Sequence, residues 1–366
     1  MTALGVFIAV IISLALVRQV YRRLCLKNIN AELRFAESAA TEGDILTLST
    51  VLSNAKWLPL PWVAVKFQVS RHLRFGDMDS AQISDDYYRN DLYNVLMYQR
   101  ITRRFEFECN KRGYFPIKSL DVTCWDLLMD KKYVAAFECK ASLTVCPSIL
   151  PMPEIDELFT QIGGNIQTRR FIHPDPFTFR GIREYSPSDP LKAINFKASA
   201  KATDLMVNLW DYSVTRQVII LLNFQKQNVW HNESLDEWAI KIAASLSHRL
   251  TEMHVPVRLI SDGIEVPEGV GDTHLKLLLE AFAHINLEQP PSVPFADILQ
   301  HSFYQYHQEP EYWLISSYHG EELEAAYKKI NGLGAKTLWI LPHSDQVPAH
   351  EGFILRNNPI LFGSEA

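Results

Sequence analysis

Hydrophobic and polar positions divide the chain into three parts with different periodicities. Residues 3–17 (ALGVFIAVIISLALV) carry no charge at all. Residues 31–147 mostly alternate between apolar and polar positions, which is typical of half-buried strands. After residue 217, continuous apolar runs alternate with helical repeats, the pattern of a parallel sheet covered by helices. The chain is therefore expected to combine an all-β domain with an α/β domain, behind an N-terminal helix.

The N-terminal part, residues 1–30, predicts a transmembrane anchor with a basic flank. Its apolar stretch, residues 3–17, is at the short end for a hydrocarbon layer of about 30 Å. Tyr21 is expected at the level of the lipid headgroups, and Arg18 is expected to extend its side chain toward them. The alternative interpretation is a buried core helix, and the position of the stretch at the N-terminus argues against it.

The order of charges around this stretch predicts its orientation. A secretory signal peptide carries its positive charge before the apolar run, whereas here Arg18, Arg22 and Arg23 follow it. Positive charge resists translocation across the membrane. The sequence therefore predicts a single-pass protein of the cell (inner or plasma) membrane, with the bulk of the chain on the cytoplasmic side.

The alternating part, residues 31–147, predicts an antiparallel β-sandwich of immunoglobulin type. Its clearest alternating runs are residues 44–52, 62–69, 103–109 and 141–146. Turn residues, such as Gly43 and Gly113, separate these runs, and their spacing suits a sandwich. The polar and acidic stretch from residue 76 to 91 is expected to be a long loop between strands.

The last part, residues 217–366, predicts a doubly wound parallel sheet. Expected strands cover residues 218–224, 255–260, 312–316 and 336–341, and expected helices cover residues 233–253, 274–285 and 321–330. Strand and helix in repetition place helices on both faces of such a sheet. Ligands of these sheets bind at the carboxyl ends of the strands, so chemistry is to be sought there.

Composition and motifs argue against catalysis and against nucleic acid. The net charge is −6 and no long basic block occurs, so no nucleic-acid partner is expected. Five cysteines without a C-x-x-C pair favour reduced thiols over a disulfide framework or a zinc site. Glycine-rich phosphate loops, a nucleophile elbow and an H-E-x-x-H motif are all missing from the sequence. We therefore expect no enzyme activity and no cofactor.

The expected strand ends offer poor ligands for a divalent cation. Asn223 and Gln225 follow the first α/β strand and supply amide oxygens rather than carboxylates, and Lys226 adds a positive charge. Asp262 is the one acid at a strand end, and an Asp beside Gly263 is typical of a turn. A metal site is not expected.

Residues 148–216 are interpreted as a linker, in which Gly163 and Gly164 form a turn. Its most charged stretch, residues 183–201, contains a polar Ser-Pro-Ser-Asp-Pro turn at residues 186–190. An amphipathic stretch follows, with Leu191, Ile194 and Phe196 expected to face inward. Two interpretations remain open for the charges there: partly buried pairs that lock the two domains together, or a contact surface for a partner.

This stretch also resembles a known family. Residues 183–201 are similar to the hallmark R-E-Y-x-x-G-D-x-x-R-x-I-x-W-x-x-S-A-R of the "domain of unknown function 58" proteins, which carry a von Willebrand factor A-like domain. Ser188 stands for the glycine of the hallmark, Lys192 and Lys201 for arginines, and Phe196 for the tryptophan. Further matches are an N-x-x-x-L-P-L-P-W-x-x-V-like run (residues 54–65), an R-G-Y turn (residues 112–114) and a V-x-P (residues 145–147).

The resemblance implies a von Willebrand factor A-like domain whose metal-binding positions, Asn223, Gln225 and Gln227, are degenerate. It also implies work beside a MoxR-type AAA+ ATPase, often with a transglutaminase-like membrane protein. The expected function is a membrane-anchored, non-catalytic adaptor or scaffold in complex assembly or cell-envelope processes. The alternative is an extracytoplasmic adhesion or envelope-binding protein, which needs the opposite topology. The candidate binding residues are Arg183, Glu184, Tyr185, Asp189, Lys192, Phe196, Lys197 and Ser199.

Overall fold

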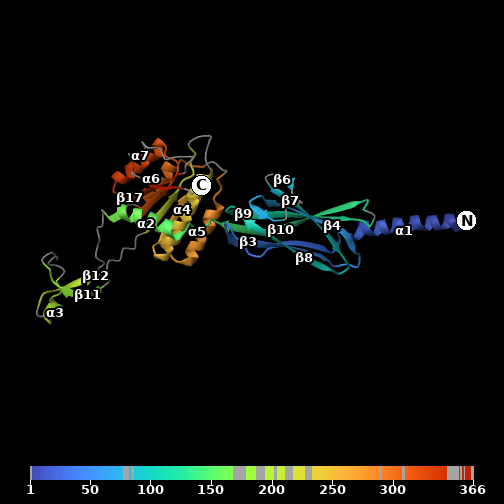
Figure 1. Ribbon diagram of the computed structural model, residues 1–366, viewed down its shortest axis with the longest axis horizontal. Coiled ribbons are helices and arrows are strands. Elements are labelled where there is room, and N and C mark those ends of the chain that lie inside the picture. The colour runs from blue at the N-terminus through green and yellow to red at the C-terminus, as the bar shows by residue number, and fades with distance from the viewer. Residues whose placement is uncertain are drawn as a thin grey trace. The chain divides into compact units, whose positions relative to one another are not determined.

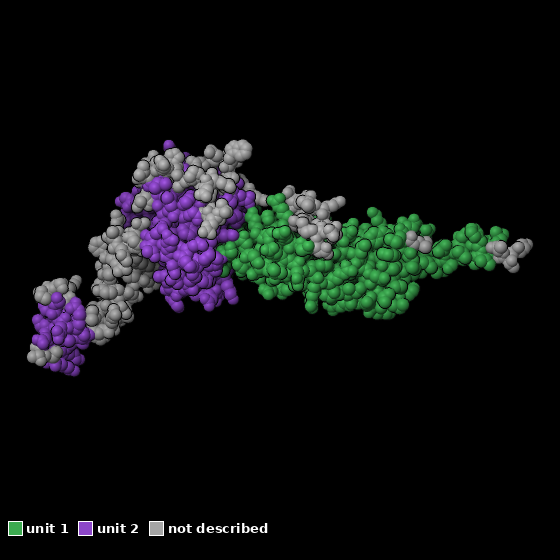
Figure 2. Space-filling model, in the orientation of Figure 1, with its two compact units in different colours: residues 1–148, 277–286 green, residues 149–276, 287–366 purple. Residues whose placement is uncertain are grey.

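The chain folds into two compact units, which Figure 2 distinguishes by colour. A computed structural model describes residues 2–76, 82–83, 86–127, 129–167, 179–186, 194–201, 204–210, 217–226, 233–287, 291–306, 310–343, 354, 357 and 359–363. The first unit comprises residues 1–148 and 277–286, and the second comprises residues 149–276 and 287–366. The protein is mixed α/β, is built mostly of β-sheets, and begins with an apolar helix, α1 (Thr2–Leu24).

The first unit contains two sheets that enclose one core (Figure 1). Its strands are β1 (Ile29–Phe35), β2 (Ala39–Thr41), β3 (Ile45–Asn54), β4 (Leu60–Ser70), β5 (Leu73–Phe75), β6 (Gln82–Ile83), β7 (Asp86–Val95), β8 (Arg100–Cys109), β9 (Gly113–Trp125) and β10 (Lys132–Cys146). One sheet has the order β1-β3-β8-β5 and the other the order β2-β10-β9-β4-β7-β6. Alternate residues point inward, so Leu33 and Leu48 of one sheet share the core with Val63 and Leu120 of the other. The two packed sheets form the β-sandwich expected for this part of the chain.

The expectation of a long loop from residue 76 to 91 is wrong for its described second half. Residues from Asp86 onward form β7, which pairs antiparallel with β4. The stretch is polar because it turns an ion pair inward: Arg89 Nε lies 3.0 Å from Asp91 Oδ2, and both side chains are about nine-tenths buried. The Arg89 guanidinium also lies 3.8 Å from the ring centre of Phe105. An inward-facing ion pair thus gives a strand the composition of a loop.

The R-G-Y turn begins β9 and contacts residues 282–285, all within the first unit. Arg112 is buried and donates hydrogen bonds to the carbonyl oxygens of Phe282 and Ile285, at 2.8 and 2.9 Å. Gly113 has a φ of 154°, and a Cβ there would lie 2.9 Å from the ring of Phe115. Glycine is therefore required at this turn, because a side chain would be strained and would clash.

The second unit is built on a six-stranded sheet with helices on both faces (Figure 1). Its strands are β13 (Val218–Leu222), β14 (Val257–Ser261), β15 (Ile264–Gly269), β16 (Glu311–Ile315), β17 (Lys336–His343) and β18 (Ile360–Gly363), in the order β15-β14-β13-β16-β17-β18. All neighbours are parallel except β15, which lies antiparallel at one edge. Its helices are α2 (Met152–Gln167), α4 (Glu233–Glu252), α6 (Phe295–Tyr306), α7 (Glu321–Gly332) and the first residues of α5 (Asp272–His284), which belongs to the first unit from Leu277 onward.

Alternation along β16 divides the helices between the two faces of the sheet. Tyr312 and Leu314 share a core with residues of α6 and α7. Trp313 points to the other face, where its ring lies 5.8 Å from that of Phe159 in α2. A parallel strand covered on both faces must be apolar throughout, and every residue of β13 is accordingly buried.

Helix α2 replaces part of the predicted linker. Gly163 and Gly164 lie inside this helix, so their assignment to a turn is wrong. Buried residues Ile155, Leu158 and Ile162 recur at three- and four-residue steps along it. Their burial outweighs a cost of about 1 kcal/mol for each glycine within a helix.

The linker also contains a small separate sheet. It consists of β11 (Phe179–Glu184) and β12 (Met206–Trp210), which pair antiparallel, with a one-turn helix α3 (Phe196–Ser199) against β12. We refer to β11, α3 and β12 as the hallmark module, because they hold the described part of residues 183–201.

Candidate functional site

Backbone hydrogen bonds and two polar side chains build the hallmark module. Arg183 and Glu184 pair with Val207 and Met206 across the two strands. Asn195 caps α3, because its Oδ1 accepts a hydrogen bond from the amide of Ala198 at 2.9 Å. The fold of the module thus depends on residues at both ends of the hallmark.

Ser199 and Tyr185 are among the candidate binding residues, and both hold the module together. The Ser199 hydroxyl donates to the carbonyl oxygen of Asn195 and accepts from the amide of Met206, both at 2.8 Å. Tyr185 is half-buried, and its amide donates to the carbonyl oxygen of Leu205. These two residues therefore stabilise the fold of the module itself.

Other candidate residues lie on the surface of the module. Phe196 is 75% exposed, and Ile182 and Leu205 are also exposed apolar side chains. The expectation that Phe196 faces inward is therefore wrong. Phe196 is the first residue of a helix of one turn, and none of the residues of that helix is buried. A helix of one turn is covered only on the side that packs against β12, so its other side chains remain exposed.

The described charges of the hallmark are also exposed. Arg183, Glu184 and Lys197 all lie on the surface, and Arg183 donates a hydrogen bond to the carbonyl oxygen of Glu184 at 2.9 Å. Asp189 and Lys192 lie outside the described residues.

The carboxyl ends of β13 and β16 hold a buried polar cluster. Asn223 Nδ2 donates to the hydroxyl of Ser316 at 3.0 Å, and Asn223 Oδ1 accepts from the amide of Gln225 at 2.9 Å. Ser316 in turn donates to the carbonyl oxygen of Tyr318 at 2.9 Å. Both Asn223 and Ser316 are buried. Because each polar atom of the Asn223 amide already has a protein partner, this strand end is closed by its own hydrogen bonds.

Asp262, the acid at the neighbouring strand end, is likewise engaged. Its two carboxylate oxygens accept hydrogen bonds from the amide and the hydroxyl of Ser292, at 2.7 and 2.6 Å. Among the described residues, no group of three or more histidines, cysteines or acids is placed to hold a metal ion. The described strand ends therefore consist of internal turns and caps.

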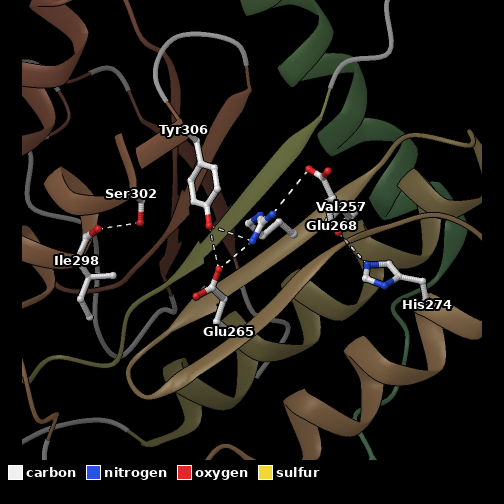
Figure 3. Close-up of polar contacts among 8 residues, drawn as sticks. Val257, Glu265, Glu268, His274, Ile298, Ser302 and Tyr306 are labelled. Carbon is white, nitrogen blue, oxygen red and sulfur yellow. Dashed lines mark hydrogen bonds and ion pairs between the residues drawn. The ribbon is translucent and has the colours of Figure 1, made fainter. Parts of the chain in front are cut away.

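A polar cluster at the antiparallel edge of the same sheet has the composition of a reactive site (Figure 3). Arg258 Nη1 on β14 donates to Glu265 Oε1 on β15 at 2.8 Å and to the Tyr306 hydroxyl on α6 at 3.0 Å. Tyr306 also donates to Glu265 at 3.0 Å. Burial and this hydrogen bond raise the pKa of Tyr306, so it remains a protonated donor. The cluster fastens β15 and α6 to the sheet, and its groups are occupied with one another.

The end of α1 is built into the core of the first unit. Tyr21 is 1% exposed, and its hydroxyl donates to the carbonyl oxygen of Pro59 at 2.9 Å. Val17, Val20 and Leu24 pack against the same core. Tyr21 therefore lies inside the sandwich, and its expected place among the lipid headgroups is wrong.

Lys56 and Arg18 complete this junction. Lys56 is 6% exposed, and its Nζ donates to the carbonyl oxygens of Cys25 and Lys27, at 2.8 and 2.7 Å. These carbonyls follow the last turn of α1, where a positive charge also complements the helix dipole. On the other side, Arg18 Nη2 lies 2.8 Å from Asp130 Oδ2. We call α1, residues 55–59 and residues 126–131 the helix–sandwich junction.

Sequence patterns carried little signal for this junction. Lys56 is the one charged residue in the N-x-x-x-L-P-L-P-W-x-x-V-like run, which is a clue that it has a buried partner. Asp130 pairs with a residue 112 positions away, and no local pattern reveals such a contact.

Comparisons with known proteins leave the fold to be argued from the chain itself. No family model matches the sequence, and no curated protein matches it. A CARDB domain from Pyrococcus furiosus has 11% identity and a TM-score of 0.21, covering 32% of this chain and 91% of its own. A non-cellulosomal cohesin from Archaeoglobus fulgidus has 10% identity and a TM-score of 0.22, covering 35% of this chain and 97% of its own. These likenesses are too weak to inform function.

Proposed function

We propose that this chain is a membrane-anchored, non-catalytic adaptor or scaffold that works with a MoxR-type AAA+ ATPase in complex assembly or cell-envelope processes. The partner follows from the resemblance of the hallmark and of the runs around residues 54–65 and 112–114. A transglutaminase-like membrane protein is a second proposed partner on the same ground. No nucleic-acid partner and no cofactor form part of the proposal.

The α/β unit is proposed to be a von Willebrand factor A-like domain with a degenerate metal site. Its strand order supports this: numbered along the chain, the strands lie in the order 3-2-1-4-5-6, the order of a doubly wound sheet. The site of such a sheet lies at the carboxyl ends of its central strands. Here Asn223 stands at that place, with its amide already hydrogen-bonded.

Membrane anchoring is supported by the way α1 ends. Among the described residues, α1 is the helix that is long and apolar enough to cross a membrane, and a signal sequence would pass the same test. A leader cut away after residue 24 would take Tyr21 and Leu24 out of the sandwich core. Losing a buried aromatic side chain costs about 3–5 kcal/mol. The folded sandwich therefore favours a helix that stays attached.

The observation that carries the adaptor function is the exposed surface of the hallmark module. Phe196, Ile182 and Leu205 expose apolar side chains there, beside the charges of Arg183 and Lys197. Aromatic and arginine side chains dominate the binding energy of protein interfaces. This composition favours a contact surface for a partner protein over a buried lock between domains.

Binding of the full chain to the purified MoxR-type ATPase of the same organism tests the proposal. Phe196→Asp should weaken binding about tenfold or more, because it places a charge in the centre of the contact. It should leave folding intact, because Phe196 is exposed and an acid is favourable at the start of a helix. Val293→Asp, at another exposed apolar position of the second unit, is the matched control. If Phe196→Asp and Val293→Asp both bound the ATPase as tightly as the wild type, the hallmark module would not be part of the contact.

A further inference from the structure

Exposed apolar side chains surround the base of α1. Six of them are each more than half exposed and lie in three loops of the first unit: Trp57, Leu96, Met97, Tyr98, Leu127 and Met129. We call these six residues the apolar collar. Large apolar side chains gathered on a surface usually mark a place that another phase or molecule covers.

Hydrogen bonds place the three loops together around the helix. Lys56, beside Trp57, donates to the carbonyl oxygens that follow α1. The amide of Tyr98 donates to the carbonyl oxygen of Lys56 at 3.1 Å, and Asn54 Nδ2 donates to that of Leu96 at 2.9 Å. These contacts fix two of the loops beside the end of the helix.

The third loop is fixed from the helix itself. Asp130, which accepts from Arg18, also donates its amide to Asp126 Oδ1 at 3.0 Å. The amide of Met129 donates to the carbonyl oxygen of Asp126 at 3.1 Å, so the turn that carries Leu127 and Met129 is held against α1. The collar therefore lies at the end of the sandwich from which α1 leaves (Figure 1).

The exposed face of α1 favours a bilayer as the occupant of this surface. Its exposed apolar side chains continue from Leu4 down to Leu16. From Val17 onward the helix packs against the sandwich core. A bilayer that takes up these exposed side chains therefore extends to the end of the sandwich where the collar lies.

The chemistry of the collar matches that layer. Trp and Tyr are enriched where the hydrocarbon meets the headgroups, and Leu and Met can enter its apolar side. Arg22, Arg23 and Lys27 are exposed at the same end and complement anionic headgroups. We infer that the apolar collar inserts into the interface of the bilayer that α1 enters, so that the sandwich is seated in the lipid surface. This inference rests on the proposed membrane anchoring.

Quenching of tryptophan fluorescence by brominated lipid tests the inference on the full chain. The protein is reconstituted into vesicles of phosphatidylcholine and phosphatidylglycerol, with or without bromine on the acyl chains. Part of the emission should be quenched, and the double variant Trp57→Phe/Trp62→Phe, which removes the two exposed indoles near this end and keeps the half-buried Trp125, should lose most of the quenched part. Trp238→Phe, which removes a tryptophan of the second unit, should retain the quenched part of the emission. Phenylalanine keeps both replaced positions apolar, so folding is preserved.

Three other results would count against the collar in different ways. In the first, the chain stays in the vesicles after alkaline extraction, and the double variant is quenched as strongly as the wild type. The membrane anchor would then be supported, but the collar would not lie in the bilayer. A chain that is extracted would remove the anchor and the collar together. Shielding of Trp57 from aqueous acrylamide without lipid quenching would show that a second copy or another protein covers the collar.

Discussion

Replacing Lys56 by methionine removes the ammonium group that holds the end of α1 and keeps most of the side-chain volume. In the native chain its Nζ donates to two carbonyl oxygens, those of Cys25 and Lys27. Hydrogen bonds to a charged group contribute about 1.5–3 kcal/mol each. Burial of the ammonium offsets part of this, and the same burial lowers the pKa of Lys56. We expect Lys56→Met to destabilise the junction by about 3 kcal/mol.

Hydrogen exchange is the suitable assay, because a chain of two units does not unfold in a single step. Full-length protein in lipid nanodiscs is compared by mass spectrometry, with attention to the peptides that contain residues 18–30 and 55–60. A loss of about 3 kcal/mol should raise local opening of these peptides roughly 100-fold. Peptides of the second unit should exchange as in the wild type.

Lys66→Met is the matched control, since Lys66 is an exposed lysine on β4 of the same unit. Its replacement should change the free energy of local opening by less than about 0.5 kcal/mol in every peptide. If the peptides of the junction exchanged alike in Lys56→Met, Lys66→Met and the wild type, the two carbonyl contacts would not hold the helix end, and the description of the junction would be refuted.

Three further predictions concern the first unit. Arg112→Met should destabilise the first unit by about 2–3 kcal/mol, because two carbonyl oxygens lose a charged donor; hydrogen exchange of the peptides that contain residues 112 and 282–285 measures it, and exposed Arg74→Met should be near neutral. Burial raises the pKa of the Cys124 thiol from 9.0 to about 12. Between these pH values the unfolded chain loses the thiol proton more readily than the folded one, so the first unit keeps its full stability below pH 9 and loses stability as the pH rises toward 12. Unfolding in a pH series should show this loss, and Cys124→Ala should lack the contribution of this thiol. Cys109 and Cys124 are both buried and cannot report sidedness, whereas Ile45→Cys, at a position 71% exposed, should react with an impermeant thiol reagent in inverted vesicles; reaction on intact cells would favour the extracytoplasmic alternative.

Apolar periodicity predicted most of the α/β unit, because its strands and helices are defined by burial. The expected runs at residues 218–224 and 233–253 became β13 and α4 with boundaries within two residues. Helix α6 was missed, although Phe295, Leu299 and Phe303 recur at four-residue steps and are buried. Its signal is a short apolar repeat directly behind a proline-rich stretch.

Contacts between polar groups could not be predicted in the same way. β7 has the composition of a loop because its inward charges, Arg89 and Asp91, neutralise each other. The pairing of Arg18 with Asp130 joins positions that only the fold brings together. Polar positions have a clear meaning in sequence only when their partners are local, as in the capping of α3 by Asn195.

The two interpretations of the hallmark charges differ in where their free energy would arise. A lock between domains needs burial, because a charge pair in water contributes only about 0–1 kcal/mol, whereas breaking a buried pair costs about 3–5 kcal/mol. Arg183 and Lys197 are exposed, and Phe196 beside them keeps three quarters of its surface in water. An exposed aromatic side chain contributes little to the stability of the chain that carries it, and it contributes to binding once a partner removes it from water. The exposure of these described residues therefore supports the proposal of a contact surface, while Ser199 and Tyr185 stabilise the fold of the module that carries it.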